Sequence, residues 1–532
     1  MDKATWPQKA VIYQIYPRSF KDSNNDGIGD IQGIIQKLDY LVDLGIDAIW
    51  ISPMYKSPME DFGYDVSDYC DIEPMFGTLK DFDELIKKAH KKNIKIIMDF
   101  IPSHTSSQHP WFIESKSSKD NSKRDWYIWK DPKEDGTVPN NWLSVFGGSR
   151  WEYEKKTKQY YLHTFLLDQP DLNWRNPEVQ KAMFDVLHFW LKKGVDGFRV
   201  DAFDHMYKDA LFRDEPPNPK YKKGNDDPFE SQLHIRTTQQ PELYTMIKNF
   251  NEIVSAYEGD KFIVTESYVD LPALVKLYQA GTKQHAPFNF QFISLPWEAK
   301  VYKEFIDEFD KQIGEQYLPT YVLGNHDRSR VSSRIGQNGA RVAALLQLTV
   351  RGVPTIYNGE EIGMEDSIIP ENKVQDPFEK NVPGMGLGRD PERTPMQWTS
   401  GEYAGFSEVE PWLPIPETAK EINAAVEDND PKSMLQLYKI LLRIRRISNP
   451  LLFGTYTSLP VTNTHVFAYV REYEGEKILI VLNFSDNEQT VTLPYTNAEI
   501  IINTFLDKKS GEKIAITEFS LQPHEGYLLK IL

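Results

Sequence analysis

The sequence predicts an α/β protein whose main body is a (β/α)8 barrel (TIM barrel), with a domain inserted after the third strand and an antiparallel β-sandwich at the C-terminus. Three observations support this fold class: helices that end at glycine alternate with apolar strands, the periodicity breaks after the third strand, and two-residue alternation begins near residue 458. A chain of 532 residues can hold two or three domains. We expect the barrel in residues 1–103 and 172–457, the insertion in 104–171 and the sandwich in 458–532.

Helix–glycine–strand units recur through the first part of the chain. Asp30 can cap a helix that runs to Leu44, and Gly45 ends it before an apolar strand. A helix over Phe82–Lys91 and another over Pro177–Leu191 begin further units. Apolar strands that alternate with helices indicate a parallel sheet. The eight expected strands are Val11–Tyr16, Ala48–Ile51, Ile94–Phe100, Gly197–Asp201, Phe262–Thr265, Asn289–Ile293, Thr320–Leu323 and Val353–Tyr357.

Two long stretches lack this periodicity. Residues 102–170 are rich in Trp, Lys, Ser and Asp, and an insertion of this length in a barrel is usually a lid or a binding subdomain. Residues 365–412 form a second irregular stretch after the last expected strand. Near the C-terminus, alternating apolar residues separated by turn residues predict antiparallel strands. The clearest of these runs are Val466–Val470, Ile478–Leu482, Ile500–Ile502 and Tyr527–Leu532.

Composition excludes several classes of partner. The net charge of −17 disfavours nucleic acid and anionic membranes as partners. The one cysteine, Cys70, rules out an internal disulfide and fits a reducing compartment. The N-terminus lacks the pattern of a signal peptide, and no apolar run is long enough to span a bilayer. We therefore expect a cytoplasmic protein without nucleic-acid or membrane partners.

Three acidic residues follow three of the expected strands. Arg199 and Asp201 share a strand face, so the guanidinium should lower the pKa of the Asp201 carboxyl and keep it ionised, although this pair alone could be structural. Glu266 and Asp327 follow two other strands, and the carboxyl ends of barrel strands meet at one rim. Mutual repulsion should raise the pKa of at least one of these carboxyls. Glycosidic double displacement needs one ionised and one protonated carboxyl group.

Other side chains are expected at the same rim. His104, His326 and Tyr64 lie near strand ends, and no Ser-His-Asp elbow, phosphate-binding loop or dinucleotide fingerprint competes for the site. Phe146 and Phe165 could stack on the apolar faces of sugars, although for either one alone core packing is the better explanation.

The stretch Asp22–Asp30 predicts a cation site. Oxygen-bearing side chains alternate around two glycines, as in loops that wrap a hard cation; Asp22, Asn24, Asp26 and Asp30 are the candidate ligands. Gly33 stands where an EF-hand has its bidentate Glu, which argues against a helix–loop–helix calcium sensor. The alternative is a solvated Asn/Asp turn.

Together these segments resemble a known family. The chain is similar to the α-glucosidases of the α-amylase superfamily (glycoside hydrolase family 13), in the branch of the oligo-1,6-glucosidases, over nearly its whole length. The segments that carry the resemblance are Gly45–Pro53 (GIDAIWISP), Asp99–His104 (DFIPSH), Gln169–Trp174 (QPDLNW), Gly197–Asp201 (GFRVD), Thr265-Glu266, Asn325–Asp327 (NHD), Gly352–Met364 (GVPTIYNGEEIGM) and Arg389–Trp398 (RDPERTPMQW).

The resemblance implies a role for each matching residue. Asp201 would be the nucleophile, Glu266 the general acid/base, and Asp327 would hold the sugar hydroxyls and favour the distorted ring. The positions that would bind the terminal glucose are Asp61, Tyr64, His104, Arg199, His326 and Arg393. One structural calcium ion would lie in the Asp22–Asp30 loop, with the Ile28 carbonyl as a further ligand, and no organic cofactor is implied. The insertion would be the family's domain B, and the tail its domain C.

Two positions depart from the pattern and bear on substrate choice. Ser103 stands where many members have a calcium-binding Asn, which argues against a cation there. Ala202 follows the expected nucleophile, where in this branch a Val goes with α-1,6 cleavage and a smaller residue with α-1,4 cleavage. We therefore expect a monomeric, retaining, exo-acting enzyme for short α-1,4-linked oligosaccharides such as maltose, which also transfers glucose to acceptor sugars.

Other functions stay open at this point. An oligo-1,6-glucosidase or a sucrose isomerase is the nearest alternative, although Arg328–Ser332 does not match the RLDRD-like loop of the isomerases. A transporter-associated subunit or a carbohydrate-binding protein without catalysis would not need Glu266.

Overall fold

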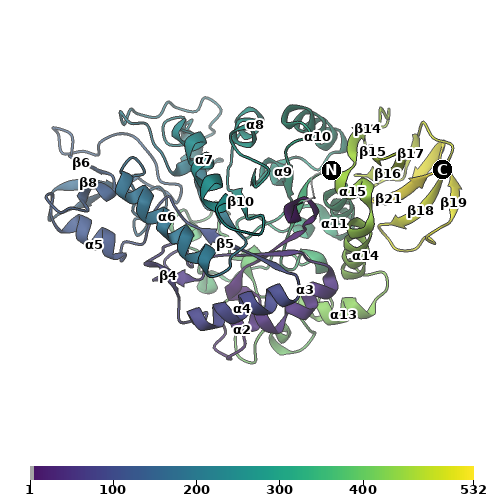
Figure 1. The fold of residues 1–532 in the computed structure, drawn as a ribbon, viewed down its shortest axis with the longest axis horizontal. Coiled ribbons are helices and arrows are strands. Elements are labelled where there is room, and N and C mark those ends of the chain that lie inside the picture. Colours follow the sequence, from purple (N-terminus) through teal and green to yellow (C-terminus); the bar gives the residue numbers. More distant parts are fainter. Residues whose placement is uncertain (1–4) are drawn as a thin grey trace.

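A parallel barrel forms the centre of the computed structural model, which describes residues 5–532 (Figure 1). Its eight strands lie in the order β11-β10-β9-β5-β2-β1-β13-β12, which confirms the predicted fold class. Their bounds are β1 Ile12–Ile15, β2 Ala48–Ile51, β5 Lys95–Phe100, β9 Gly197–Val200, β10 Phe262–Thr265, β11 His285–Pro287, β12 Thr320–Val322 and β13 Val353–Tyr357. The ladder starts at β11 and ends at β12, and the Thr320 hydroxyl joins these two edges by donating to the Pro287 carbonyl over 2.7 Å.

The predicted sixth strand is wrong. The strand is His285–Pro287, and the range Asn289–Ile293 instead leads into the short helix α9 (Gln291–Ser294). Phenylalanines alternate along residues 288–292, and Phe288 and Phe292 are both buried. Alternate aromatic residues bury their rings equally well from a turn, so the alternation did not specify an extended backbone.

The barrel helices follow the predicted units closely. The Asp30 side chain accepts a hydrogen bond from the Gly33 N–H and caps α2 (Ile31–Gln36), which is separated at Lys37 from α3 (Leu38–Leu44). Gly45 ends α3 with φ 103°, a conformation that glycine adopts without strain. The other long helices of the barrel region are α4 Leu79–Lys91, α6 Pro177–Lys192, α7 Glu242–Ser255, α8 Leu271–Ala280, α10 Ala299–Ile313, α11 Val331–Thr349 and α14 Met434–Ile447.

Two smaller parts lie at opposite ends of the molecule (Figure 1). Between β5 and α6 the chain forms α5 (Pro110–Ser117) and a three-stranded antiparallel sheet of β6 (Trp129–Lys130), β8 (Gln159–Leu162) and β7 (Trp151–Glu154). At the C-terminus, a six-stranded sheet has the order β14-β15-β16-β21-β18-β19, beside the pair β17 (Gln489–Thr492) and β20 (Glu518–Leu521). The bounds of the six are β14 Thr455–Ser458, β15 Val466–Tyr473, β16 Glu476–Asn483, β18 Asn497–Asn503, β19 Lys513–Ala515 and β21 Gly526–Ile531. The exact domain limits stay predictions.

The C-terminal sheet shares the core of the barrel. Along β15, Phe467 and Tyr469 pack into the same apolar cluster as the barrel helices, whereas Val466 and Ala468 pack into a second cluster beneath β17 and β20. This two-sided burial follows from the alternation of side chains along a strand. Of the helices in residues 5–532, none combines the length and apolar character needed to cross a membrane.

Candidate active site

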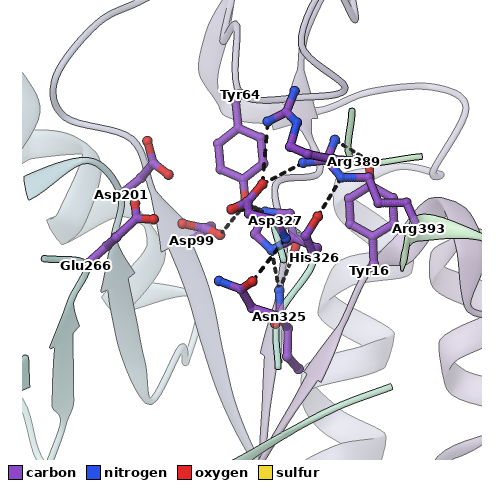
Figure 2. Close-up of polar contacts among 12 residues, drawn as sticks. Tyr16, Tyr64, Asp99, Asp201, Glu266, Asn325, His326, Asp327, Arg389 and Arg393 are labelled. Atoms are coloured by element: carbon purple, nitrogen blue, oxygen red, sulfur yellow. Dashed lines mark hydrogen bonds and ion pairs between the residues drawn. The ribbon is translucent and has the colours of Figure 1, made fainter. Parts of the chain in front are cut away.

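Two carboxyl groups stand together where two neighbouring barrel strands end. Asp201 follows β9 and its N–H donates to the Phe100 carbonyl over 2.8 Å, while Glu266 follows β10 and its N–H donates to the Val200 carbonyl over 2.9 Å. These bonds continue the ladders by one residue, so both side chains leave the rim at the same level. Figure 2 shows them next to each other, on the opposite side of the site from Asp327 and its arginines.

One buried guanidinium is shared by three carboxyl groups. Arg199 Nη1 lies 2.7 Å from Asp99 Oδ1 and 2.5 Å from Asp201 Oδ1, and Nη2 lies 2.8 Å from Glu266 Oε2. Asp99 lies on β5 and is fully buried, and the sequence analysis had not placed it in the site. Its signal was available, because it lies one residue before the end of the predicted strand Ile94–Phe100 and opens one of the segments that carry the family resemblance.

The shared guanidinium and the burial of the three carboxyls affect the pKa values of this group. Burial, together with the charges of Glu266 and Asp99, raises the pKa of Asp201 well above its usual range, and burial raises the pKa of Asp99 to about 6. The expectation that Arg199 keeps the pKa of Asp201 low is therefore wrong. The guanidinium does favour the ionised form, but a single positive charge is divided among three acids. Burial and the neighbouring carboxyls therefore shift Asp201 toward its protonated form.

A tight turn follows Asp201. Ala202 has φ 44° and ψ 39°, the left-handed conformation that costs an alanine about 1 kcal/mol. The turn directs the Ala202 N–H to Glu266 Oε2, to which it donates over 2.7 Å. The backbone N–H that follows Asp201 thus holds the Glu266 carboxylate.

Asp327 lies across the pocket among positive charges. Arg393 Nη2 lies 2.7 Å from Asp327 Oδ1, and Arg389 Nη1 lies 3.4 Å from the same oxygen. Burial alone would raise the pKa of Asp327, but the facing charges, those of Arg393 and Arg389 included, hold it far below its usual range. Burial lowers the pKa of His326 well below its usual value, so this imidazole is neutral. Its Nε2 lies 2.5 Å from the Tyr64 hydroxyl, and the two rings stack.

A third group closes the pocket on the side of the inserted segment. Asp61 is buried, with one oxygen 2.8 Å from Arg389 Nη2 and the other accepting from the Gln169 amide over 3.1 Å. The same amide lies 3.1 Å from His104 Nε2. Asp376 holds Arg389 from behind, at 2.7 Å. Sequence reasoning had missed Arg389, Asp376 and Gln169, although Arg389 opens one of the quoted segments.

The two candidate aromatic residues belong to this wall. Phe146 lies 5.7 Å from Phe165, ring centre to ring centre, and the Arg389 guanidinium lies 4.9 Å above the Phe146 ring. Phe165 also lies edge-on to His104 at 5.3 Å. Every side chain predicted for catalysis or glucose binding is therefore in one continuous group.

The predicted cation loop is elsewhere, against residues 406–412. Asp22 accepts hydrogen bonds from the Gly27 N–H and the Ser407 hydroxyl, and Asp30 accepts from Ser23 as well as capping α2. Within residues 5–532, no three His, Cys, Asp or Glu side chains are grouped as metal ligands. The carboxylates of Asp22 and Asp30 thus find hydrogen-bond donors inside the protein.

A (β/α)8 barrel with paired carboxyls at adjacent strand ends, beside buried polar groups and aromatic rings, is the arrangement of a glycoside hydrolase. The sequence comparisons are specific. Residues 14–454 match the family described as "Alpha amylase, catalytic domain", and residues 456–528 match "Maltogenic Amylase, C-terminal domain". The chain belongs to the α-amylase family, glycoside hydrolase family 13.

Individual relatives agree over nearly the full length. The chain is 38% identical to the oligo-1,6-glucosidase of Parageobacillus thermoglucosidasius, with 99% of each chain covered, and 39% identical to maltase 1 of Drosophila virilis, with 100% of this chain and 87% of that one covered. Among solved structures, the α-glucosyl transfer enzyme XgtA superposes with a TM-score of 0.92 at 37% identity, covering 100% of both chains. The trehalulose synthase MutB of Pseudomonas mesoacidophila MX-45 gives 0.89 at 35% identity, again with 100% of both chains covered.

Proposed function

We propose that this protein is a retaining, exo-acting α-glucosidase that releases α-glucose from the non-reducing ends of short α-1,4-glucosides such as maltose. The observation that carries the proposal is the acid pair Asp201 and Glu266 on adjacent strand ends, joined by Arg199 Nη1 at 2.5 Å and Nη2 at 2.8 Å. Two carboxyls bridged by one guanidinium are close enough for the second to act as nucleophile, the arrangement of a retaining enzyme.

The reaction would use the residues as follows. Asp201 attacks the anomeric carbon while Glu266 protonates the glycosidic oxygen, giving a covalent glucosyl-enzyme and a free aglycone. Glu266, now ionised, takes a proton from water, which attacks the anomeric carbon and frees Asp201 with net retention. This sequence needs Asp201 bare and Glu266 protonated at the start. We infer that sugar binding moves the proton that the three acids share onto Glu266.

Exo action rests on the closed wall of the pocket. Arg389 lies 2.8 Å from Asp61 and 3.4 Å from Asp327, and Asp376 fixes it from behind. These groups would hold the hydroxyls of a terminal glucose and leave no passage for further sugars beyond it. A pocket closed in this way accepts a non-reducing end rather than the middle of a chain.

The preference for α-1,4 over α-1,6 links rests on Ala202. Its side chain is small and lies next to the acid pair, since its own N–H contacts Glu266. A methyl group leaves room beside the scissile bond that a branched side chain would fill.

Initial rates on maltose, maltotriose, isomaltose, sucrose and trehalose, with products and anomers followed by NMR, test the proposal. We expect α-glucose as the first product and the highest kcat/KM on maltose. An equal or higher kcat/KM on isomaltose would refute the linkage preference, and β-glucose as first product would refute retention.

A second activity is supported by the relatives. XgtA is described as a glucosyl transfer enzyme and MutB as a trehalulose synthase, and both share the whole fold with this chain. A covalent glucosyl-enzyme can be attacked by a sugar hydroxyl instead of water. We therefore include transfer of glucose to acceptor sugars at high substrate concentration. We also expect a monomeric, cytoplasmic enzyme that needs no organic cofactor.

A calcium ion in the Asp22–Asp30 loop stays a prediction. Its support is the alternation of oxygen-bearing side chains and the bend at Gly27, where φ is 86°. If the ion binds, treatment with a chelator should lower the melting temperature by several degrees, and added Ca²⁺ should restore it. An unchanged melting temperature in a chelated, refolded sample would show that the loop holds itself by its own hydrogen bonds.

A further inference from the structure

Two hydrogen bonds join the segment after Asp201 to the segment after Glu266. The Ala202 N–H donates to Glu266 Oε2 over 2.7 Å, and the Tyr268 N–H donates to Asp204 Oδ2 over 2.9 Å. One donor lies in the segment after β9 and the other in the segment after β10, so the two bonds hold these segments together. We call this pair of hydrogen bonds the clasp.

Asp204 contributes the half of the clasp that lies away from the sugar pocket. It lies on a short 3-10 helix, Phe203–His205, and is 5% exposed. Its second oxygen, Oδ1, is buried and makes no hydrogen bond to any residue of 5–532. A small cavity of about 10 Å³ borders the carboxyl, lined mainly by apolar side chains of α7, α8 and the loop after β10, such as Leu243, Val269 and Leu277. Two donors face this carboxyl: the Tyr268 N–H, which donates to Oδ2 over 2.9 Å, and the Ser267 hydroxyl, whose interaction lowers the pKa of Asp204.

We propose that Asp204 is a positioning residue, which fixes the separation of the Asp201 and Glu266 carboxyls by holding the backbone at Tyr268. The inference rests on the proposed function. The spacing of the two acids decides whether the second can attack the anomeric carbon, and a misplacement of 1 Å can reduce the rate about 100-fold. Glu266 is held at its carboxylate by Ala202 and at its backbone by the β10 ladder. Asp204 holds the chain two residues further on, where that ladder has ended.

The clasp is sensitive to pH. Burial, and to a smaller degree the charge of Glu266, raises the pKa of Asp204 to about 7, and Tyr244 on α7 is the other titratable group that faces it. Ionisation of Asp204 makes Oδ2 a stronger acceptor for the Tyr268 N–H. Ionisation also leaves a charge in the apolar interior. The contribution of Asp204 to the free energy of unfolding is therefore smallest above pH 7. The folded state binds the proton more tightly than the unfolded chain, so stability is lost between pH 4 and 7 as the pH rises.

The test compares Asp204→Ala, which removes the acceptor, with Asp204→Asn, which keeps an oxygen for the Tyr268 N–H. On the best α-glucoside of the wild type, we expect Asp204→Ala to lower kcat about 30- to 100-fold with KM changed less than twofold. Asp204→Asn should recover kcat to within about fivefold. Asn cannot gain charge, so the ratio of wild-type to Asp204→Asn kcat should rise between pH 6 and 8.

Asp270→Ala is the matched control. Asp270 lies in the same loop and accepts one backbone N–H, that of Ala273, but it caps α8 and does not reach the Asp201 segment. It should lower the melting temperature and leave kcat unchanged. The inference is overturned if folded Asp204→Ala keeps kcat within twofold of the wild type, if Asp204→Asn is as damaged as Asp204→Ala, or if the kcat ratio is flat with pH. The last of these tests uses only the wild type and Asp204→Asn, so it holds even if Asp204→Ala fails to fold. A wild type that turns over no α-glucoside would instead refute the proposed function.

Discussion

Replacing Glu266 with Gln is expected to lower kcat on maltose by about 10³-fold or more, with binding of maltose kept within about threefold. Gln has the size of the native side chain and can still accept the Ala202 N–H, which lies 2.7 Å from Glu266 Oε2. It has no proton to give to the leaving oxygen. Initial rates measure the loss of turnover, and calorimetric titration of the variant with maltose measures binding.

Two comparisons make this result specific to proton transfer. A p-nitrophenyl α-glucoside has a leaving group that needs little protonation, so the first step should be impaired far less on it, and added azide should restore turnover because it attacks without a general base. Glu252→Gln, at an exposed position of α7, should behave as the wild type. Unchanged turnover in Glu266→Gln would remove Glu266 from the mechanism and favour the carbohydrate-binding alternative.

Replacing Arg199 with Met is expected to destabilise the fold by about 3–5 kcal/mol at neutral pH and to lower kcat/KM at least about 100-fold. The guanidinium is 1% exposed and contacts Asp99, Asp201 and Glu266. Without it, three acids remain in one buried group with no cation. Thermal unfolding and steady-state kinetics measure the two effects.

The stability lost in the Arg199→Met variant should depend on pH in a defined direction. Arg199 lowers the pKa of Asp99 and Asp201, so without it these two carboxyls should hold protons to higher pH than in the wild type, whereas in the unfolded chain they release theirs near pH 4. Where the folded state binds more protons, stability falls as pH rises, so the difference in melting temperature should widen between pH 5 and 8. Arg175→Met removes an exposed partner of Glu242, whose side chain is 41% exposed, and should change stability by less than about 1 kcal/mol. Equal effects of the two substitutions would mean that the Arg199 cluster is no stronger than a surface ion pair.

The sequence was most informative where one physical requirement decides both local structure and position. The apolar face of α6 is an example, since Val179, Met183 and Trp190 are buried as its periodicity predicts. Asp201 and Glu266 are another, because the carboxyl ends of parallel strands must meet at one rim.

The sequence was least informative where the outcome depends on tertiary neighbours. The alternation of Phe288, Phe290 and Phe292 fits a strand, but the ladder ends before them. The raised pKa of Asp201 depends on burial and on Glu266 and Asp99, which are distant in sequence and converge on the same guanidinium. Arg389 joins Asp61 to Asp327 from an irregular loop, where no periodicity indicates direction.

The position of the C-terminal sheet has a consequence for biosynthesis. Phe467 and Tyr469 complete the apolar cluster of the barrel, and the buried Arg471 donates to the carbonyls of Thr349 and Gly454. These β15 residues follow every catalytic group in the sequence, so a nascent chain that already holds all the catalytic groups still exposes apolar surface on one side of the barrel. The barrel can therefore complete its apolar core only after this C-terminal strand has been synthesised.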